Sequence, residues 1–143
     1  MTILLAASGV TGAVAIGLAL LCGRYVVVRV TGRSMTPCLR PGDRVLVRRG
    51  APGNLRAGTI AVAWVQRPGG HWVIKRVAAT PGDRVPSSVR PVTGRISVVP
   101  EGKLVLLSDN PAGTDSRRWG FVPASDLLGQ VIARLPRNGY GAD

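Results

Sequence analysis

The sequence predicts a mainly β protein, with a single N-terminal transmembrane helix followed by a compact, antiparallel, β-barrel-like domain. Three observations predict this fold class. The chain opens with a long apolar segment, its remainder consists of short apolar runs separated by glycine and proline, and no long amphipathic helix follows residue 24. At 143 residues the chain has the length of one ordinary domain.

The N-terminal segment, residues 3–22, reads ILLAASGVTGAVAIGLALLC and contains no charged side chain. About 20 apolar residues form a helix long enough to cross the roughly 30 Å hydrocarbon layer of a membrane. A cleavable secretory signal would carry basic residues before its apolar core, and a lipoprotein signal would carry small residues, not two leucines, before Cys22. We therefore expect residues 1–23 to be a retained anchor and residues 24–143 to be the folded domain.

Seven runs after residue 24 have the length and composition of strands, and they span residues 25–31, 43–49, 59–66, 71–79, 95–99, 103–108 and 127–135. The segments between them, such as PGD, GAPGN and TPGD, have the composition of turns, and Asp43 and Asp83 look like turn residues. The sequence RPGG between two runs is typical of a β-hairpin, with Gly69 and Gly70 available for positive φ angles.

The chain is strongly basic, with a formal net charge of +12. This charge suits the anionic lipids of a bilayer next to an anchor, at about 1 kcal/mol per basic residue close to the surface. Nucleic acid is not expected as a partner, because the basic residues are scattered along strands and no helix-turn-helix or zinc spacing occurs. With His71 as the only histidine, we expect no metal and no cofactor, and Cys22 in the anchor is not expected to pair with Cys38.

One turn carries candidate chemistry. The stretch VTGRSMTPCLRPGDRVLV, residues 30–47, places Ser34 between two predicted strands, with Gly32 before it and Pro37 after it. A serine hydroxyl is a poor nucleophile unless a neighbouring base takes its proton. His71 is one candidate base, but it follows Pro-Gly-Gly and is expected at an exposed hairpin tip.

Lys75 is the other candidate base. It lies in HWVIKRV, where apolar neighbours would disfavour its charged form and lower its pKa. A neutral lysine can take a proton from serine, whereas arginine stays charged at any working pH. The chain has nineteen basic residues, yet only Lys75 and Lys103 are lysines. The competing interpretation is a lysine that points from a strand into water, and the composition alone leaves both open.

Three segments of the chain resemble type I signal peptidases, which are membrane-anchored serine endopeptidases of the Ser-Lys class. GRSMTPCLRPGDRVLV resembles the nucleophile segment of that family. KRVAATPGD, residues 75–83, resembles its lysine segment, and SDNPAGTDSRRWGFVPASDLLGQVIAR, residues 108–134, resembles its last segment. The three segments follow one another in the family's order behind an apolar N-terminal segment.

The resemblance implies roles for individual residues. Ser34 would be the nucleophile and Lys75 the general base of an acyl-enzyme mechanism, while Gly32 and Met35 would lie at the oxyanion and substrate groove. The supporting residues would be Thr114, Asp115 and Arg117.

The chain also departs from the family's pattern. Relatives often hold the lysine with a serine two places before the aspartate, where this chain has Gly113 followed by Thr114. Two interpretations stay open, that Thr114 substitutes for this serine and that Lys75 is held less tightly. Ser108 stands where a glycine is usual. Many relatives carry a serine as a second oxyanion donor at the position of Gly32.

The function that the resemblance implies is removal of signal peptides from translocated precursor proteins by a single-pass enzyme of the cell membrane. This function requires the domain on the outer face of the membrane. The arginines that follow the anchor predict the cytoplasmic side by the positive-inside rule, and we give the function more weight than the charges. Two alternatives stay open, a dedicated maturation protease for one partner protein and a non-catalytic, membrane-tethered basic binding module.

Overall fold

The computed structural model describes residues 18, 21–50, 53, 55–66 and 69–137. These residues form one antiparallel sheet of seven strands in the order β1-β2-β7-β3-β4-β5-β6. The strands are β1 (Tyr25–Arg29), β2 (Arg44–Arg49), β3 (Ile60–Val65), β4 (His71–Ala79), β5 (Lys103–Leu107), β6 (Val122–Pro123) and β7 (Leu127–Leu135). The short helices are α2 (Arg90–Thr93), α3 (Ser116–Trp119) and η2 (Ala124–Asp126). The predicted antiparallel, mainly β fold is confirmed.

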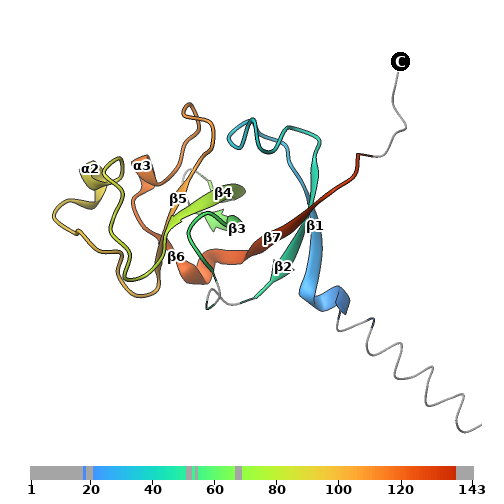
Figure 1. Ribbon diagram of the computed structural model, residues 1–143, viewed down its shortest axis with the longest axis horizontal. Coiled ribbons are helices and arrows are strands. Elements are labelled where there is room, and N and C mark those ends of the chain that lie inside the picture. Colours follow the sequence, from blue (N-terminus) through green and yellow to red (C-terminus); the bar gives the residue numbers. More distant parts are fainter. Residues whose placement is uncertain (1–17, 19–20, 51–52, 54, 67–68, 138–143) are drawn as a thin grey trace, which may run out of the picture.

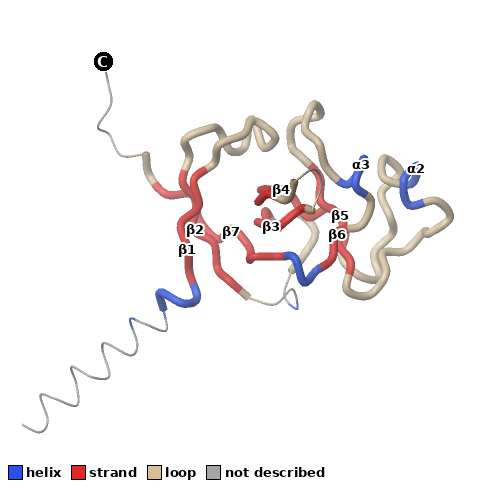
Figure 2. Tube along the Cα trace, turned by 180° about the vertical axis from the view of Figure 1, so that it is seen from behind, coloured by secondary structure: helices blue, strands red, loops and turns tan. Residues whose placement is uncertain are grey.

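The sheet places two long loops on the same side of the molecule. Strands β1, β2 and β7 lie together at one end, β5 and β6 with α2 and α3 lie at the other, and β3 and β4 lie between them (Figure 1). The loop from β1 to β2 and the loop that follows β5 rise side by side above β3 and β4, as the view from behind also shows (Figure 2). In the described part of the chain, β1 is an edge strand that pairs with β2 alone.

Six of the seven predicted strands are present, two of them with the predicted bounds and four with an end that differs by one or two residues. The prediction of a strand at residues 95–99 is wrong. In this run Val98 makes only an isolated bridge with Arg84. Ile96 and Val98 are 46% and 47% exposed, so this run lacks the buried face that would hold it in a sheet. The two-residue strand β6 was not predicted, since so short a segment carries no periodic signal.

The predicted anchor, residues 1–23, lies almost entirely outside the described residues. Among the helices that the structure does describe, none combines the length and the apolar character needed to cross a membrane.

A cluster of buried apolar side chains lies beneath the loop from β1 to β2. Met35 and Leu39 of this loop pack with Val45 and Val47 of β2 and Val62 of β3. Burial of a side chain of this size contributes about 1.5–3 kcal/mol relative to leaving it in water. The apolar side chains of Met35 and Leu39 therefore hold the loop on the sheet.

Asp43 closes the same loop. Its buried carboxylate accepts a hydrogen bond of 2.8 Å from the Arg40 backbone N–H, as expected for a turn residue. Arg137 Nε donates to it at 2.9 Å, and Arg134 pairs with it at 3.1 Å. The Arg40 N–H, opposed by burial and helped by the two arginines, holds the pKa of Asp43 below its usual value. The end of the chain's last strand is thus fixed to the turn that follows Ser34.

We expect Gly129→Ala to destabilise the fold by about 1–3 kcal/mol. Gly129 in β7 pairs with Arg49 on one side and Val62 on the other. A Cβ at this position would overlap the Arg48 carbonyl group, which is backbone and cannot rotate away. Chemical denaturation would measure the loss. Gly53→Ala is the matched control, because a Cβ there meets nothing within 4 Å, and equal stability of the two variants would contradict the prediction.

Candidate active site

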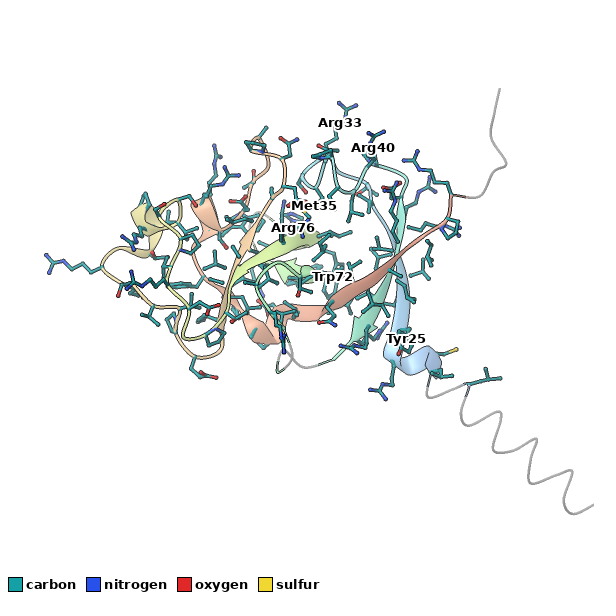
Figure 3. All side chains as sticks on the ribbon, viewed as in Figure 1. Tyr25, Arg33, Met35, Arg40, Trp72 and Arg76 are labelled. Carbon is teal, nitrogen blue, oxygen red and sulfur yellow. The ribbon has the colours of Figure 1, made fainter. Side chains whose placement is uncertain are left out.

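Ser34 lies in a short turn whose shape is fixed by its neighbours. The N–H and hydroxyl of Thr36 both donate to the Arg33 carbonyl, at 3.2 and 2.8 Å, and the Leu39 N–H donates to the Met35 carbonyl at 2.8 Å. Met35 is 1% exposed and anchors the turn in the core. Figure 3 shows Arg33 and Arg40 pointing away from the fold, whereas Met35 points into it. Ser34 is therefore half-buried at the boundary between core and solvent.

The loop after β5 holds this turn from the other side. The Asn110 N–H donates to the Ser34 carbonyl at 2.9 Å, and the Asn110 side-chain amide donates to the Arg33 carbonyl at 3.1 Å. These bonds join two segments that are far apart in the sequence. The position of Ser34 consequently depends on the last of the three motif segments as well as on its own.

Ser34 and Lys75 line the same cavity, which has a volume of about 380 Å³. Its lining comes mainly from residues 28–32, from Ser34 and Met35, and from residues 71–75 of β4. Val62, Thr114 and Trp119 complete it. No hydrogen bond joins the Ser34 hydroxyl to the Lys75 amine in the described part of the chain.

Lys75 is a buried amine. It is 4% exposed, whereas His71 on the same face of β4 is exposed at the strand's start. Its Nζ donates to Ser108 Oγ at 2.8 Å and lies 5.7 Å from the centroid of the Trp119 ring. Burial is the main cause that lowers the pKa of Lys75, the Asp115 carboxylate opposes this shift, and Arg117 adds to it.

Asp115 and Arg117 form a paired group behind Lys75. The buried Asp115 carboxylate accepts two hydrogen bonds of 2.8 Å from the Arg117 guanidinium and one of 2.8 Å from the Ser108 N–H. Burial alone would raise the pKa of Asp115, but Arg117 and the N–H donors hold it below its usual value. The pair thus fixes Ser108, and Arg117 offsets part of the effect by which Asp115 raises the pKa of Lys75.

A second ion pair lies next to the Lys75–Ser108 contact, between the residues that follow each of them, Arg76 and Asp109. Arg76 Nε and Nη2 each donate to the Asp109 carboxylate at 2.7 Å, and Arg76 Nη1 donates to the Gly58 carbonyl at 2.7 Å. The adjacent contacts Lys75–Ser108 and Arg76–Asp109 therefore join β4 to the start of the loop after β5. Such bidentate pairs restrict both partners in direction as well as distance.

The residues singled out from the sequence gather at this cavity. Its lining includes Gly32, Ser34, Met35, Lys75 and Thr114, and Asp115 and Arg117 are linked to Lys75 through Ser108. The hydroxyl that Lys75 contacts, however, belongs to Ser108, not to Thr114. Sequence analysis missed this role, although a serine in place of the family's usual glycine was a visible signal. Cys38, four residues after Ser34, is exposed with a free thiol.

The chain also has relatives among known proteins. A family model described as "Signal peptidase, peptidase S26" matches residues 4–93 and 86–135. The chain is 34% identical over 121 residues to the mitochondrial ATP-independent inner membrane protease subunit 1a of Arabidopsis thaliana, covering 78% of this chain and 72% of that protein. It is also 26% identical over 164 residues to signal peptidase IB of Staphylococcus aureus, covering 86% of this chain and 85% of that protein.

We expect Arg117→Gln to raise the pKa of Lys75. The change removes a cation that lowers this pKa and leaves the Asp115 carboxylate, which raises it, without its counter-ion. An NMR titration of the Lys75 side chain would measure the shift. Arg118→Gln is the matched control on the same helix, because Arg118 is exposed and is not a cause of the Lys75 shift. A pKa that stays constant or falls in Arg117→Gln would contradict the electrostatic account.

Proposed function

Because this chain belongs to the peptidase S26 family of signal peptidases, and is therefore a serine-type peptidase, we propose that Ser34 and Lys75 are its catalytic dyad. The proposed enzyme is a membrane-bound endopeptidase that cleaves signal peptides from translocated precursors. The observation that carries the dyad is a lysine that is 4% exposed and shares one cavity with a half-buried serine.

The reaction would begin with neutral Lys75. As Ser34 Oγ attacks the scissile carbonyl carbon, its proton passes to Lys75 Nζ and a tetrahedral oxyanion forms. Lys75 then gives the proton to the leaving amine as the peptide bond breaks, which leaves an ester on Ser34. Lys75 next takes a proton from water, the hydroxide attacks the ester, and return of the proton to Ser34 restores the enzyme.

The oxyanion would be held in part by the Ser34 backbone N–H. Within the described residues this N–H has no hydrogen-bond partner, so it is available to a substrate oxygen. Loss of one such donor typically costs about 3–4 kcal/mol of transition-state stabilisation. Gly32, which also lines the cavity, offers no side-chain donor, but it leaves space for the substrate backbone to approach.

The partners of the proposed enzyme are precursor proteins and the lipid bilayer. The anchor at residues 1–23 would hold the catalytic domain at the outer face of the cell membrane. Exposed Arg24 and Arg29 beside the exposed Val27 give the start of the domain a mixed basic and apolar surface, which suits anionic headgroups. Trp72, which is 54% exposed and packs edge-on against Trp64, adds an aromatic residue of the kind enriched at membrane interfaces.

We expect Ser34→Ala and Lys75→Arg each to reduce precursor cleavage by at least about 10²–10⁴-fold, because each removes one half of the proton transfer. Lys75→Arg keeps the positive charge and removes the ability to act as a base at neutral pH. Cleavage of a radiolabelled precursor by the full chain in lipid vesicles would measure the loss.

Lys103→Arg is the matched control, because it makes the same exchange at the chain's other lysine, in β5, and should leave cleavage unchanged. Retained cleavage in Lys75→Arg would reject lysine as the base. A binding module without catalysis would instead keep its function in both variants and lose it when several exposed arginines are reversed in charge.

A further inference from the structure

We propose that Ser108 is the positioning residue for Lys75. We also propose that a serine at position 113 could hold Lys75 instead, but only when Ser108 is replaced by glycine. The proposal rests on the catalytic role of Lys75 proposed above. It adds that one hydroxyl must contact the Lys75 amine, and that this hydroxyl can come from a serine at position 108 or at position 113, but not from both at once.

The first step of the argument is that Ser108 fixes a flexible side chain. Lysine has four side-chain torsions, and Lys75 has one hydrogen-bond partner in the described part of the chain, Ser108 Oγ at 2.8 Å. Ser108 is itself held, because its N–H donates to the buried Asp115 carboxylate at 2.8 Å. A series of hydrogen bonds therefore runs from Arg117 of α3 through Asp115 and Ser108 to Lys75, and it fixes the position of the amine relative to α3.

The second step concerns Gly113. A Cβ on this residue would lie 2.6 Å from Ser108 Cβ and would overlap Ser108 Oγ. Gly113 does not have a positive φ angle, so its backbone would accept any ordinary residue. The severe overlap at this position is therefore with the Ser108 side chain, while the Asn110 carbonyl oxygen, 3.2 Å from the same Cβ, is a tight contact that a shift of a few tenths of an ångström would relieve.

The third step is that the two positions converge on one point. Since a Cβ at residue 113 would overlap the site of Ser108 Oγ, a serine there would carry its hydroxyl into the same space, next to the Lys75 amine. The loop at Gly113 is already fixed, because its N–H donates to the Asn110 carbonyl at 2.9 Å and its carbonyl accepts from Arg117 Nη2 at 3.1 Å. With glycine at 108 and serine at 113, the hydroxyl would be retained and the overlap with residue 108 removed, which leaves only the closer approach to the Asn110 carbonyl oxygen.

The test is a cycle of full-chain variants, namely Ser108→Gly, Gly113→Ser and the double variant, with Ser108→Ala as a second way to remove the hydroxyl while keeping the Cβ. Each is assayed for precursor cleavage against pH and for its thermal midpoint. Loss of the hydroxyl should lower kcat by about 10- to 100-fold with little change in KM, as for one hydrogen bond to a group that becomes charged. Gly113→Ser alone should melt at a lower temperature. The double variant should regain kcat to within about tenfold of the parent and the parent's thermal midpoint.

The pH profile separates positioning from a general loosening of the site. Without the Ser108 acceptor the charged amine loses a partner, so the acidic limb of kcat should move to lower pH. Entry of water into a loosened site would restore hydration of the charged amine and move that limb upward.

Ser125→Ala, which removes an exposed hydroxyl in η2, is the matched control and should match the parent. Full kcat in Ser108→Ala, or an upward shift of its acidic limb, would overturn the positioning role. A double variant that does not fold, or that is no more active than Ser108→Gly, would overturn the exchange. Failure of the dyad would instead appear as retained activity in Lys75→Arg, whatever these variants do.

Discussion

The site depends on keeping one amine out of water. Lys75 lies between β-sheet neighbours and Trp119, and its burial disfavours the ammonium form more than any other influence on it. A buried charge nearby would normally cancel this effect. Here the Asp115 carboxylate is bound by the Arg117 guanidinium, and the two act on the amine in opposite directions. The fold thus supplies hydrogen bonds beside Lys75, while burial remains the largest influence on its protonation.

The polar groups of this region are all accommodated. In the described part of the chain, no buried side-chain nitrogen or oxygen lacks a hydrogen-bond partner. Asp43 and Asp115, both fully buried, each accept hydrogen bonds from arginine and from backbone N–H groups. Since unpaired buried carboxylates are costly, these networks specify one arrangement of the two loops. The serine turn is fixed at one end by Asp43 and at the other by Asn110.

The sequence was informative where a feature is periodic or local. Strands such as β3 and β4 follow from apolar runs bounded by glycine and proline, and the hairpin between them follows from RPGG, where Gly69 and Gly70 have φ angles of 78° and 65°. The convergence of Ser34 and Lys75 on one cavity could be anticipated only through the family resemblance, because local patterns carry no information on which loops meet. The Ser108 contact was missed because it depends on the space left by Gly113, which is a three-dimensional property.

The edge position of β1 has a consequence for what can reach Ser34. Residues 28–32, at the end of this strand and just beyond it, form a wall of the cavity, and β2 is the strand's one partner among the described residues. A peptide that pairs with such an edge uses its own backbone N–H and carbonyl groups, which in a helix are already bonded to one another. Under the proposed function, a bilayer-spanning segment of a precursor, which is helical, would have to uncoil over several residues before its scissile bond met the Ser34 hydroxyl. Helix-breaking residues just upstream of the bond would then speed cleavage by lowering the cost of uncoiling, even if they touch nothing in the protein.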